Sequence, residues 1–200
     1  MNFLAVDTSA SYLTVIVTRG EDRFVSYLEK AGMKHSTLLL PEIDRTLKEA
    51  NLTLDKLDYF AVVVGAGSFT GIRIGVSTIK ALAKSTKKPA VAVTSFDTMA
   101  YNMIEEKVLA LIDAKHGHYY ACGYHNGVVD LPPAYLPESE VLSLSAGRKV
   151  LSVEPLAVNS EIVSPVEGLF AAATKKADLC ASAEDLIPLY VRKSQAEEGR

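Results

Sequence analysis

The chain has 200 residues, of which 48% are apolar and 22% are charged, and its formal net charge is −3 at pH 7. This composition is typical of a folded globular protein and excludes a chain that is disordered throughout. The slight acidic excess argues against a stand-alone nucleic-acid-binding protein, which usually carries a strong basic excess. No stretch approaches the roughly 20 apolar residues that a membrane span needs, so we expect no membrane contact.

Two features of the sequence indicate a cytoplasmic protein. Asp7 interrupts the first apolar run, which has no basic lead, so we expect no secretory signal peptide. Cys122 and Cys180 form no CxxC pair, and we expect both to be free thiols in a reducing cytosol.

The first half of the chain predicts strands before helices. A meander of three strands is expected over residues 2–6, 12–18 and 23–29. A helix follows over residues 35–51, where Leu40, Ile43, Leu47 and Ala50 recur at helical spacing on one face. A buried strand, a glycine-rich loop, a helix and another strand then make a βαβ unit, over residues 59–64, 65–71, 72–85 and 89–94.

The second half has weaker patterning. A helix is expected over residues 96–106, then a hairpin of strands 107–113 and 119–124. Beyond Asn126 the pattern is broken by Pro132, Pro133, Pro137, Pro155 and Pro165, so short elements are expected apart from a helix over residues 168–181. No internal repeat is visible, and a change of composition near residue 96 indicates a boundary between lobes.

The glycine-rich loop leaves three interpretations open. Gly65, Gly67 and Gly71 allow positive φ angles and close backbone approach before a helix whose amino end can attract an anion. The loop lacks the lysine of a P-loop, and its GxGxxxG spacing differs by one residue from a dinucleotide fingerprint, for which Asp97 would be the acidic residue. The alternatives are therefore a tight turn that serves packing, a phosphate contact and dinucleotide binding.

Two further polar clusters also have a functional and a structural interpretation. Asp7-Thr8-Ser9 at the end of the first strand suits either a metal–phosphate contact or an Asx turn. His116 and His118 suit either two ligands of a metal ion or ordinary residues at the tip of a turn. Because no third ligand is evident, we expect no metal site.

Both long helices have more apolar surface than one sheet can cover. On the second helix, Ile72, Val76, Ile79 and Ala83 form one stripe, and a second stripe contains Ile74, Thr78, Ala81 and Leu82. Leu38 and Leu39 extend the apolar surface of the first helix in the same way. Such helices are buried on two sides, so we expect a covering element from this chain or from a partner.

Motifs along nearly the whole chain resemble those of the TsaB (YeaZ) family. The GAGSFTGIRIG segment of residues 65–75 is similar to the family's GxGSFTGxRxG, with Ala66 where proline is usual. Weaker matches, in the family's order, are Leu4-Ala5-Val6-Asp7-Thr8-Ser9, His35-Ser36, Leu39-Leu40-Pro41, Ile112-Asp113-Ala114-Lys115 and Pro188-Leu189-Tyr190-Val191-Arg192. Lys115 stands where the family has arginine.

The resemblance implies an α/β fold of the actin-like, RNase H-like (ASKHA) group, a mixed sheet flanked by helices. It implies a first lobe, residues 1–95, that carries the interface helices. Residues 96–200 would form a smaller, degenerate second lobe whose final segment packs back.

The resemblance also implies a scaffold subunit that is not itself an enzyme. It would bind a TsaD-type catalytic paralogue, act with a TsaE-type ATPase, and support transfer of a threonylcarbamoyl group to the adenosine next to the anticodon of tRNAs. TsaD-like chains carry a metal-binding HxxxH where this chain has Ser95 and Met99, so no metal is expected. No cofactor is expected on this chain alone; ATP or ADP belongs to the assembled complex, and tRNA is held mainly through the complex.

In this family the first two long helices form the heterodimer, and a homodimer when the partner is absent. The interface residues expected on these helices are Leu38, Leu39, Glu42, Ile43, Ile72, Arg73, Val76, Ile79 and Ala83. A weak nucleotide or phosphate contact is expected at Asp7, Thr8, Ser9, Gly65, Gly67 and Ser68. Two alternatives are an actin-like ATPase or phosphotransferase that acts alone, and a peptidase. The missing metal histidines count against the peptidase.

Overall fold

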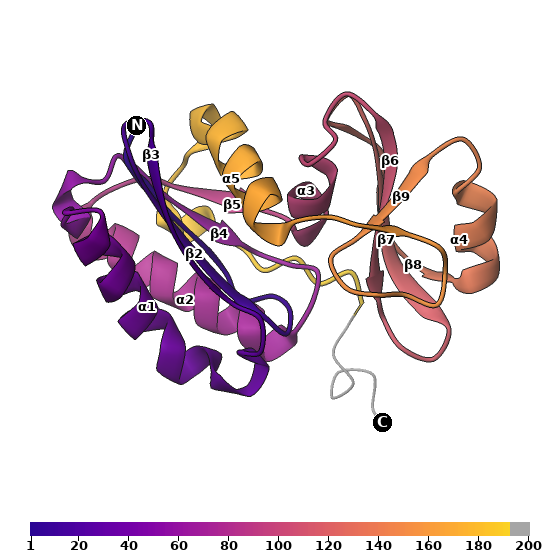
Figure 1. Ribbon diagram of the computed structural model, residues 1–200, viewed down its shortest axis with the longest axis horizontal. Coiled ribbons are helices and arrows are strands. Elements are labelled where there is room, and N and C mark those ends of the chain that lie inside the picture. Colours follow the sequence, from indigo (N-terminus) through magenta and orange to yellow (C-terminus); the bar gives the residue numbers. More distant parts are fainter. Residues whose placement is uncertain (193–200) are drawn as a thin grey trace. The chain divides into compact units, whose positions relative to one another are not determined.

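The computed structural model describes residues 1–192, which divide into two compact units (Figure 1). The first unit contains Met1–Ser95 and Ala172–Leu189. The second contains Phe96–Ala171 and residues 190–192. Cys122 and Cys180 are free thiols, and within residues 1–192 no helix has the length and apolarity that crossing a membrane requires.

A five-stranded mixed sheet forms the centre of the first unit. Its strand order is β3-β2-β1-β4-β5, with β1 antiparallel to β2 and parallel to β4. The strands are β1 (Phe3–Asp7), β2 (Leu13–Arg19), β3 (Asp22–Leu28), β4 (Tyr59–Val63) and β5 (Ala90–Val93). β1 and β4 are buried along their whole length, as expected for apolar strands covered on both faces. The predicted opening meander is confirmed.

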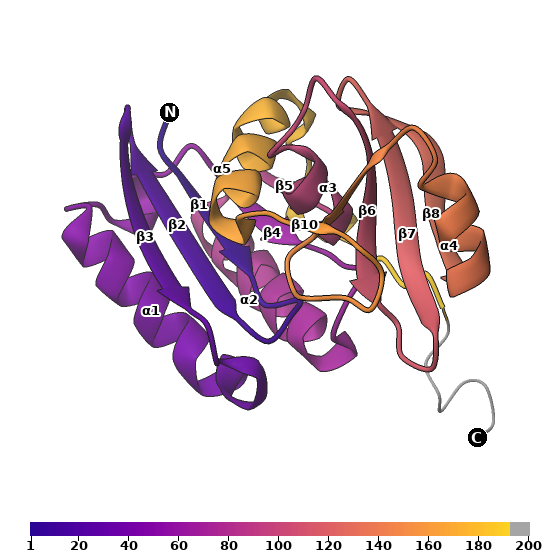
Figure 2. The same cartoon turned by 45° about the vertical axis from the view of Figure 1, so that its right-hand side comes forward.

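Two long helices, α1 (His35–Glu49) and α2 (Phe69–Thr86), lie side by side on one face of this sheet (Figures 1 and 2). α2 begins three residues earlier than predicted, because Ser68 caps it: the Ser68 hydroxyl accepts a hydrogen bond from the Gly71 amide at 3.2 Å. Short 3-10 helices complete the unit at η1 (Gly32–Lys34), η2 (Leu54–Lys56), η3 (Ala177–Leu179) and η4 (Ala183–Asp185).

The second unit repeats the strand arrangement of the first. Its sheet order is β10-β9-β6-β7-β8, with β6 antiparallel to β7 and parallel to β9. The elements from residue 95 to residue 175 are α3 (Ser95–Ala100), β6 (Lys107–Asp113), β7 (His118–His125), β8 (Val128–Pro137), α4 (Glu138–Leu144), β9 (Lys149–Ser152), β10 (Glu161–Ile162) and α5 (Pro165–Lys175). The start of α3, at Ser95, and the end of α5, from Ala172, belong to the first unit. Read from β8 to β10, this sheet has the same strand order and strand directions as β3-β2-β1-β4-β5 in the first unit. The sequence did not reveal this structural repeat.

Three expectations for the second half were wrong. β8 is a ten-residue strand although it contains Pro132, Pro133 and Pro137, because it lies at the edge of the sheet, where a missing amide donor costs little. The helix expected over residues 96–106 ends at Ala100, and the last helix spans Pro165–Lys175 rather than 168–181.

Candidate functional site

The glycine-rich loop between β4 and α2 lies against the residues that end β1. A Cβ on Gly67 would overlap the carbonyl oxygen of Ser9, and a Cβ on Gly71 would overlap that of Thr8. The Ser68 amide donates to the Ser9 carbonyl oxygen at 2.7 Å. Close backbone approach therefore explains two of the three glycines without any ligand.

Gly65 begins the loop beside a different segment of the first unit. Its φ angle is +120°, and a Cβ there would lie 2.5 Å from the carbonyl oxygen of Leu189. The Leu189 amide donates to the Val64 carbonyl oxygen at 2.7 Å, so the chain beyond η4 runs directly over the end of β4. Packing therefore accounts for the third glycine as well.

The polar side chains at the end of β1 are engaged inside the unit. Asp7 is fully buried; its carboxylate accepts hydrogen bonds from the Ser9 amide at 2.8 Å and from the Tyr12 hydroxyl at 3.0 Å. The first of these contacts is an Asx turn. The Thr8 hydroxyl donates to the Gly71 carbonyl oxygen at 2.7 Å. This geometry favours the Asx turn and the packing interpretation over a phosphate contact.

Burial changes the acidity of Asp7. The pKa of this carboxyl is raised above its ordinary value, chiefly because burial disfavours the charged form. Hydrogen bonds from Ser9 and Tyr12 and the nearby His35 oppose this effect without cancelling it. His35 is itself buried, with Nε2 2.8 Å from the Tyr12 carbonyl oxygen.

Ser95 and Met99, expected from the resemblance to stand where TsaD-like chains carry metal-binding histidines, are both buried. Ser95 Oγ lies 2.5 Å from the Ala66 carbonyl oxygen and 3.1 Å from Ser9 Oγ, so it fastens the glycine loop. Met99 has no exposed surface. The Asp97 carboxylate is engaged within the second unit: it is buried and accepts from the Tyr124 hydroxyl at 2.9 Å.

The two histidines of the β6–β7 turn do not converge on a common point. The ring of His118 stacks on Tyr135, with centroids 4.7 Å apart, and its Nδ1 lies 2.9 Å from the His116 carbonyl oxygen. Among residues 1–192, no three His, Cys, Asp or Glu side chains are grouped so that they could hold a metal ion.

Most residues predicted for the helix interface lie in the core of the first unit. Those buried against the sheet are Leu39, Ile43, Ile72, Val76, Ile79 and Ala83. Leu38 is partly buried against the same core. A side chain already buried in its own unit has no apolar surface to give to a partner, so the six buried residues are corrected from interface anchors to core residues. Leu38, like Ile74 and Leu82, keeps part of its surface exposed. Of the predicted set, Arg73 remains exposed.

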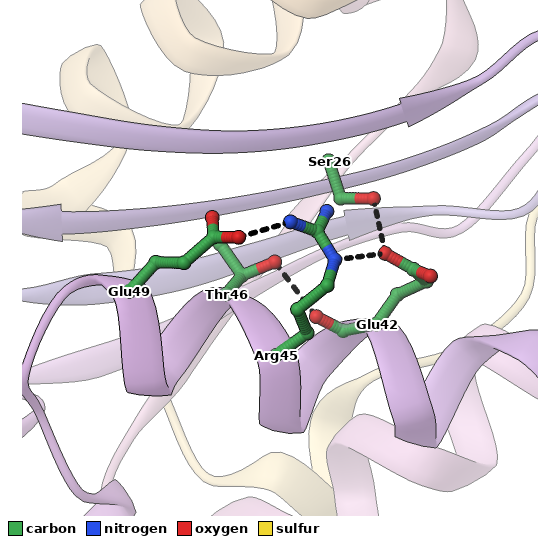
Figure 3. Close-up of polar contacts among 5 residues, drawn as sticks. All are labelled: Ser26, Glu42, Arg45, Thr46 and Glu49. Carbon is green, nitrogen blue, oxygen red and sulfur yellow. Dashed lines mark hydrogen bonds and ion pairs between the residues drawn. The ribbon is translucent and has the colours of Figure 1, made fainter.

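Glu42, the other predicted interface residue, fastens α1 to the sheet (Figure 3). Its carboxylate accepts hydrogen bonds from the Ser26 hydroxyl of β3 at 2.6 Å and from Arg45 Nε at 2.9 Å. Arg45 also pairs with Glu49, and the Thr46 hydroxyl donates to the Glu42 carbonyl oxygen at 2.7 Å. The pKa of Glu42 is lowered, first by the Ser26 hydrogen bond and then by Arg45.

A different set of residues forms the outward apolar surface of the two helices. Glu42 identifies the flank of α1 that faces β3, and contacts of Lys80 and Lys84 with Glu184 identify the flank of α2 that faces η4. With about 100° per residue, the opposite flanks carry Leu40 on α1 and Ile74, Thr78 and Leu82 on α2. We call Leu40, Ile74, Thr78, Ala81 and Leu82 the α1–α2 surface; Leu40 is 55% exposed.

Comparisons with known proteins agree with these motifs. A family model described as "TsaD: tRNA N6-adenosine threonylcarbamoyltransferase" matches residues 29–197. Two proteins named "tRNA threonylcarbamoyladenosine biosynthesis protein TsaB" are similar to 65% and 64% of the chain, at 31% identity in Bacillus subtilis and 30% in Escherichia coli. The chain belongs to the TsaB (YeaZ) family of TsaD-like proteins.

The structural comparison extends the likeness to TsaB proteins over most of the chain. "YeaZ from Pseudomonas aeruginosa" is 26% identical, with a TM-score of 0.80 over 94% of this chain and 99% of that one. The predicted actin-like, RNase H-like fold is confirmed. The match spans only 58% of the length of each of the two curated TsaB relatives.

Sequence reasoning missed two features of this site. Asp113, which ends β6, accepts from the Lys115 amide at 2.7 Å and so forms the same Asx turn as Asp7 in the equivalent strand. The sequence does show an aspartate at the end of each of these two strands. It does not show that the strands are equivalent, because the two units share a strand order and not a sequence repeat. The exposure of Leu40 was also missed, because periodicity alone did not distinguish Leu40 from Leu39. The other members of the α1–α2 surface are the second stripe predicted on the second helix.

Proposed function

We propose that this chain is a non-catalytic subunit that binds a TsaD-type catalytic subunit and thereby supports threonylcarbamoyl transfer to the adenosine next to the anticodon of tRNAs. The observation that carries the proposal is the exposed apolar α1–α2 surface on a chain of the TsaB family. An exposed leucine beside partly exposed apolar side chains of a neighbouring helix favours helix-to-helix docking with a partner.

Polar groups at the glycine-rich loop are already hydrogen-bonded within the unit, and this supports a role without catalysis. In related folds a loop of this kind holds phosphates through exposed amides, whereas here the amide of Ser68 and the hydroxyl of Thr8 are used within the unit. The carboxylate of Asp7 is likewise fully buried. In the proposed complex, the catalytic subunit supplies the metal and the reacting groups, and a TsaE-type ATPase supplies ATP hydrolysis.

The α1–α2 surface can bind only one partner at a time, and this has a consequence for assembly. If the α1–α2 surface also forms a homodimer, the homodimer and the heterodimer exclude each other, because both bury the same side chains. Adding the catalytic subunit should therefore dissociate the homodimer. In this proposal tRNA and ATP or ADP are held mainly by the assembled complex.

The test is size-exclusion chromatography with light scattering of this chain mixed with a TsaD-type protein. Leu40→Glu should weaken the complex at least about tenfold, because a carboxylate would be buried in an apolar contact. Leu142→Glu is the matched control, since Leu142 is also on a helix and is 56% exposed but belongs to α4. Equal affinities of the wild type and Leu40→Glu would overturn the assignment of the surface.

A further inference from the structure

The carboxyl end of α2 and the segment 180–184 enclose a hollow in the first unit. Its volume is about 760 Å³, within the size range of ligand pockets. Small side chains leave the space open, and lysines surround it. The small residues are Ala81, Ala83, Pro89, Ala181 and Ala183, and the lysines are Lys80, Lys84, Lys87 and Lys88.

The charge around this lysine hollow is strongly positive although the whole chain is slightly acidic. Among the described residues that line it, Glu184 is the only acidic one, against four lysines. Lys84 pairs with the Glu184 carboxylate at 3.3 Å, and Lys80 donates to the Glu184 carbonyl oxygen at 3.2 Å. Lys87 and Lys88 form no ion pair with any carboxylate of residues 1–192. Two cationic groups are therefore left for an anion.

Helix stabilisation explains only part of this cluster. A cation in the last turn of a helix interacts favourably with the partial negative charge of the helix end. That effect accounts for Lys84, the basic residue in the last turn of α2. It also favours Lys87, which is the C-cap, and Lys88 beyond it, but a helix end carries only about half an elementary negative charge, against four lysines. Four cations within nine residues repel one another, and the Glu184 carboxylate offsets only one of their charges.

We propose that the lysine hollow binds phosphates of an RNA backbone. Lysine ammonium groups bind phosphate as point charges, and an RNA strand offers one phosphate for every nucleotide. Within the described part of the chain, no aromatic ring and no arginine line the hollow, so it offers no platform for a stacked base and no bidentate contact to one. Binding should therefore be independent of sequence and strongly dependent on salt. The choice of RNA over another polyanion rests on the proposed function, which brings a tRNA to the complex.

The test measures the affinity of a fluorescently labelled tRNA transcript by anisotropy over a series of KCl concentrations. It uses the complex with the TsaD-type subunit and also this chain alone. Lys87→Glu/Lys88→Glu should weaken binding about tenfold and make the slope of log affinity against log salt shallower by about 2. The matched control is Lys30→Glu/Lys34→Glu, which makes the same change of net charge at exposed lysines between β3 and α1.

Each outcome decides the proposal. Equal losses in the two double variants, an unchanged slope, or no RNA binding by wild type in either preparation would overturn it. Equal competition by polyglutamate would show a general polyanion surface and would overturn the assignment to RNA. Unchanged melting temperatures, with Lys87→Gln/Lys88→Gln as a milder variant, exclude a folding defect. If no complex forms, the proposed function fails, yet the lysine effect can still be measured on the chain alone.

Discussion

Asp7 ends β1 with both carboxylate oxygens occupied by groups of its own unit. The same Asx turn ends β6 at Asp113, but there the carboxylate is partly exposed and pairs with Lys115 at 2.6 Å. The two aspartates therefore have equivalent places in two sheets and opposite electrostatic surroundings. The pKa of Asp7 is raised by burial, whereas that of Asp113 is lowered, chiefly by its hydrogen bond with Lys115.

Replacing Asp7 with asparagine should stabilise the protein at neutral pH. A carboxyl whose pKa is higher in the folded than in the unfolded state binds extra protons when folded, so its contribution to stability is lost as the pH rises through the folded pKa. Asparagine keeps an acceptor for the Ser9 amide and carries no charge. Urea unfolding at several pH values should show the advantage of Asp7→Asn growing above the ordinary carboxyl pKa of 3.8.

Asp113→Asn is the matched control, and its effect should have the opposite sign. The lowered pKa of Asp113 means that its ionised form contributes stability above the unfolded value and loses it as the pH falls through the folded value. A loss of stability in Asp7→Asn at neutral pH would contradict the prediction, because the hydrogen bonds of the Asp7 carboxylate would then outweigh the cost of burying its charge.

Gly71 tests the packing of the glycine loop. An alanine Cβ would overlap the Thr8 carbonyl oxygen, which is backbone and cannot move alone. Alanine favours a helix over glycine by about 1 kcal/mol, but overpacking against backbone should cost about 2–3 kcal/mol and leave a net loss of about 1–2 kcal/mol. Gly32→Ala, whose nearest neighbours lie at 3.7 Å, should be close to neutral in the same denaturant titration. A neutral Gly71→Ala would refute the close contact.

At the scale of elements, α1 is held on its sheet by apolar burial on one face and by the Glu42 contacts on one flank. Leu39, Ile43 and Leu47 supply the buried face. Glu42 joins β3 through Ser26 and its own helix through Arg45. Charge-assisted hydrogen bonds of this kind, at a side chain 17% exposed, contribute more than an exposed ion pair does.

Glu42→Gln should therefore lower the free energy of unfolding by about 0.5–1 kcal/mol at neutral pH. The lowered pKa of Glu42 means that its contribution is present above the ordinary glutamate value of 4.5 and is lost as the pH falls through the folded value. The difference between wild type and variant should thus vanish in acid. Exposed Glu21 provides the control, since Glu21→Gln should change little at any pH; a difference that persists in acid would contradict this role of the Glu42 charge.

The sequence predicted the type and order of most elements but not which side of a helix faces the sheet. Leu40, Ile43, Leu47 and Ala50 fit helical spacing as well as Leu39, Ile43, Leu47 and Ala50 do, yet Leu39 is buried and Leu40 is exposed. The two residues differ by about 100° around the helix, and only the position of β2 and β3 decides between them. Proline in β8 was misleading for a similar reason, since edge position is a property of the assembled sheet.

At the scale of the whole molecule, two units share one strand topology but differ in what connects the strands. The first unit has the glycine loop and α2 between β4 and β5, whereas residues 153–160 join β9 to β10 without a helix. The glycine motif was recognisable in the sequence, and it indicated the family. The sequence did not reveal the lysine hollow, because that hollow depends on residues that meet only after folding, such as Lys84 and Glu184.

The most direct test of the proposed role is threonylcarbamoyl transfer to tRNA by the TsaD-type subunit and its ATPase, with and without this chain. We predict that transfer depends on the chain, that Leu40→Glu abolishes most of the stimulation, and that Leu142→Glu retains it. The chain alone should hydrolyse no ATP. Transfer at an unchanged rate without the chain, or ATP turnover by the isolated chain that Asp7→Asn removes, would contradict the proposed role and favour an enzyme that acts alone.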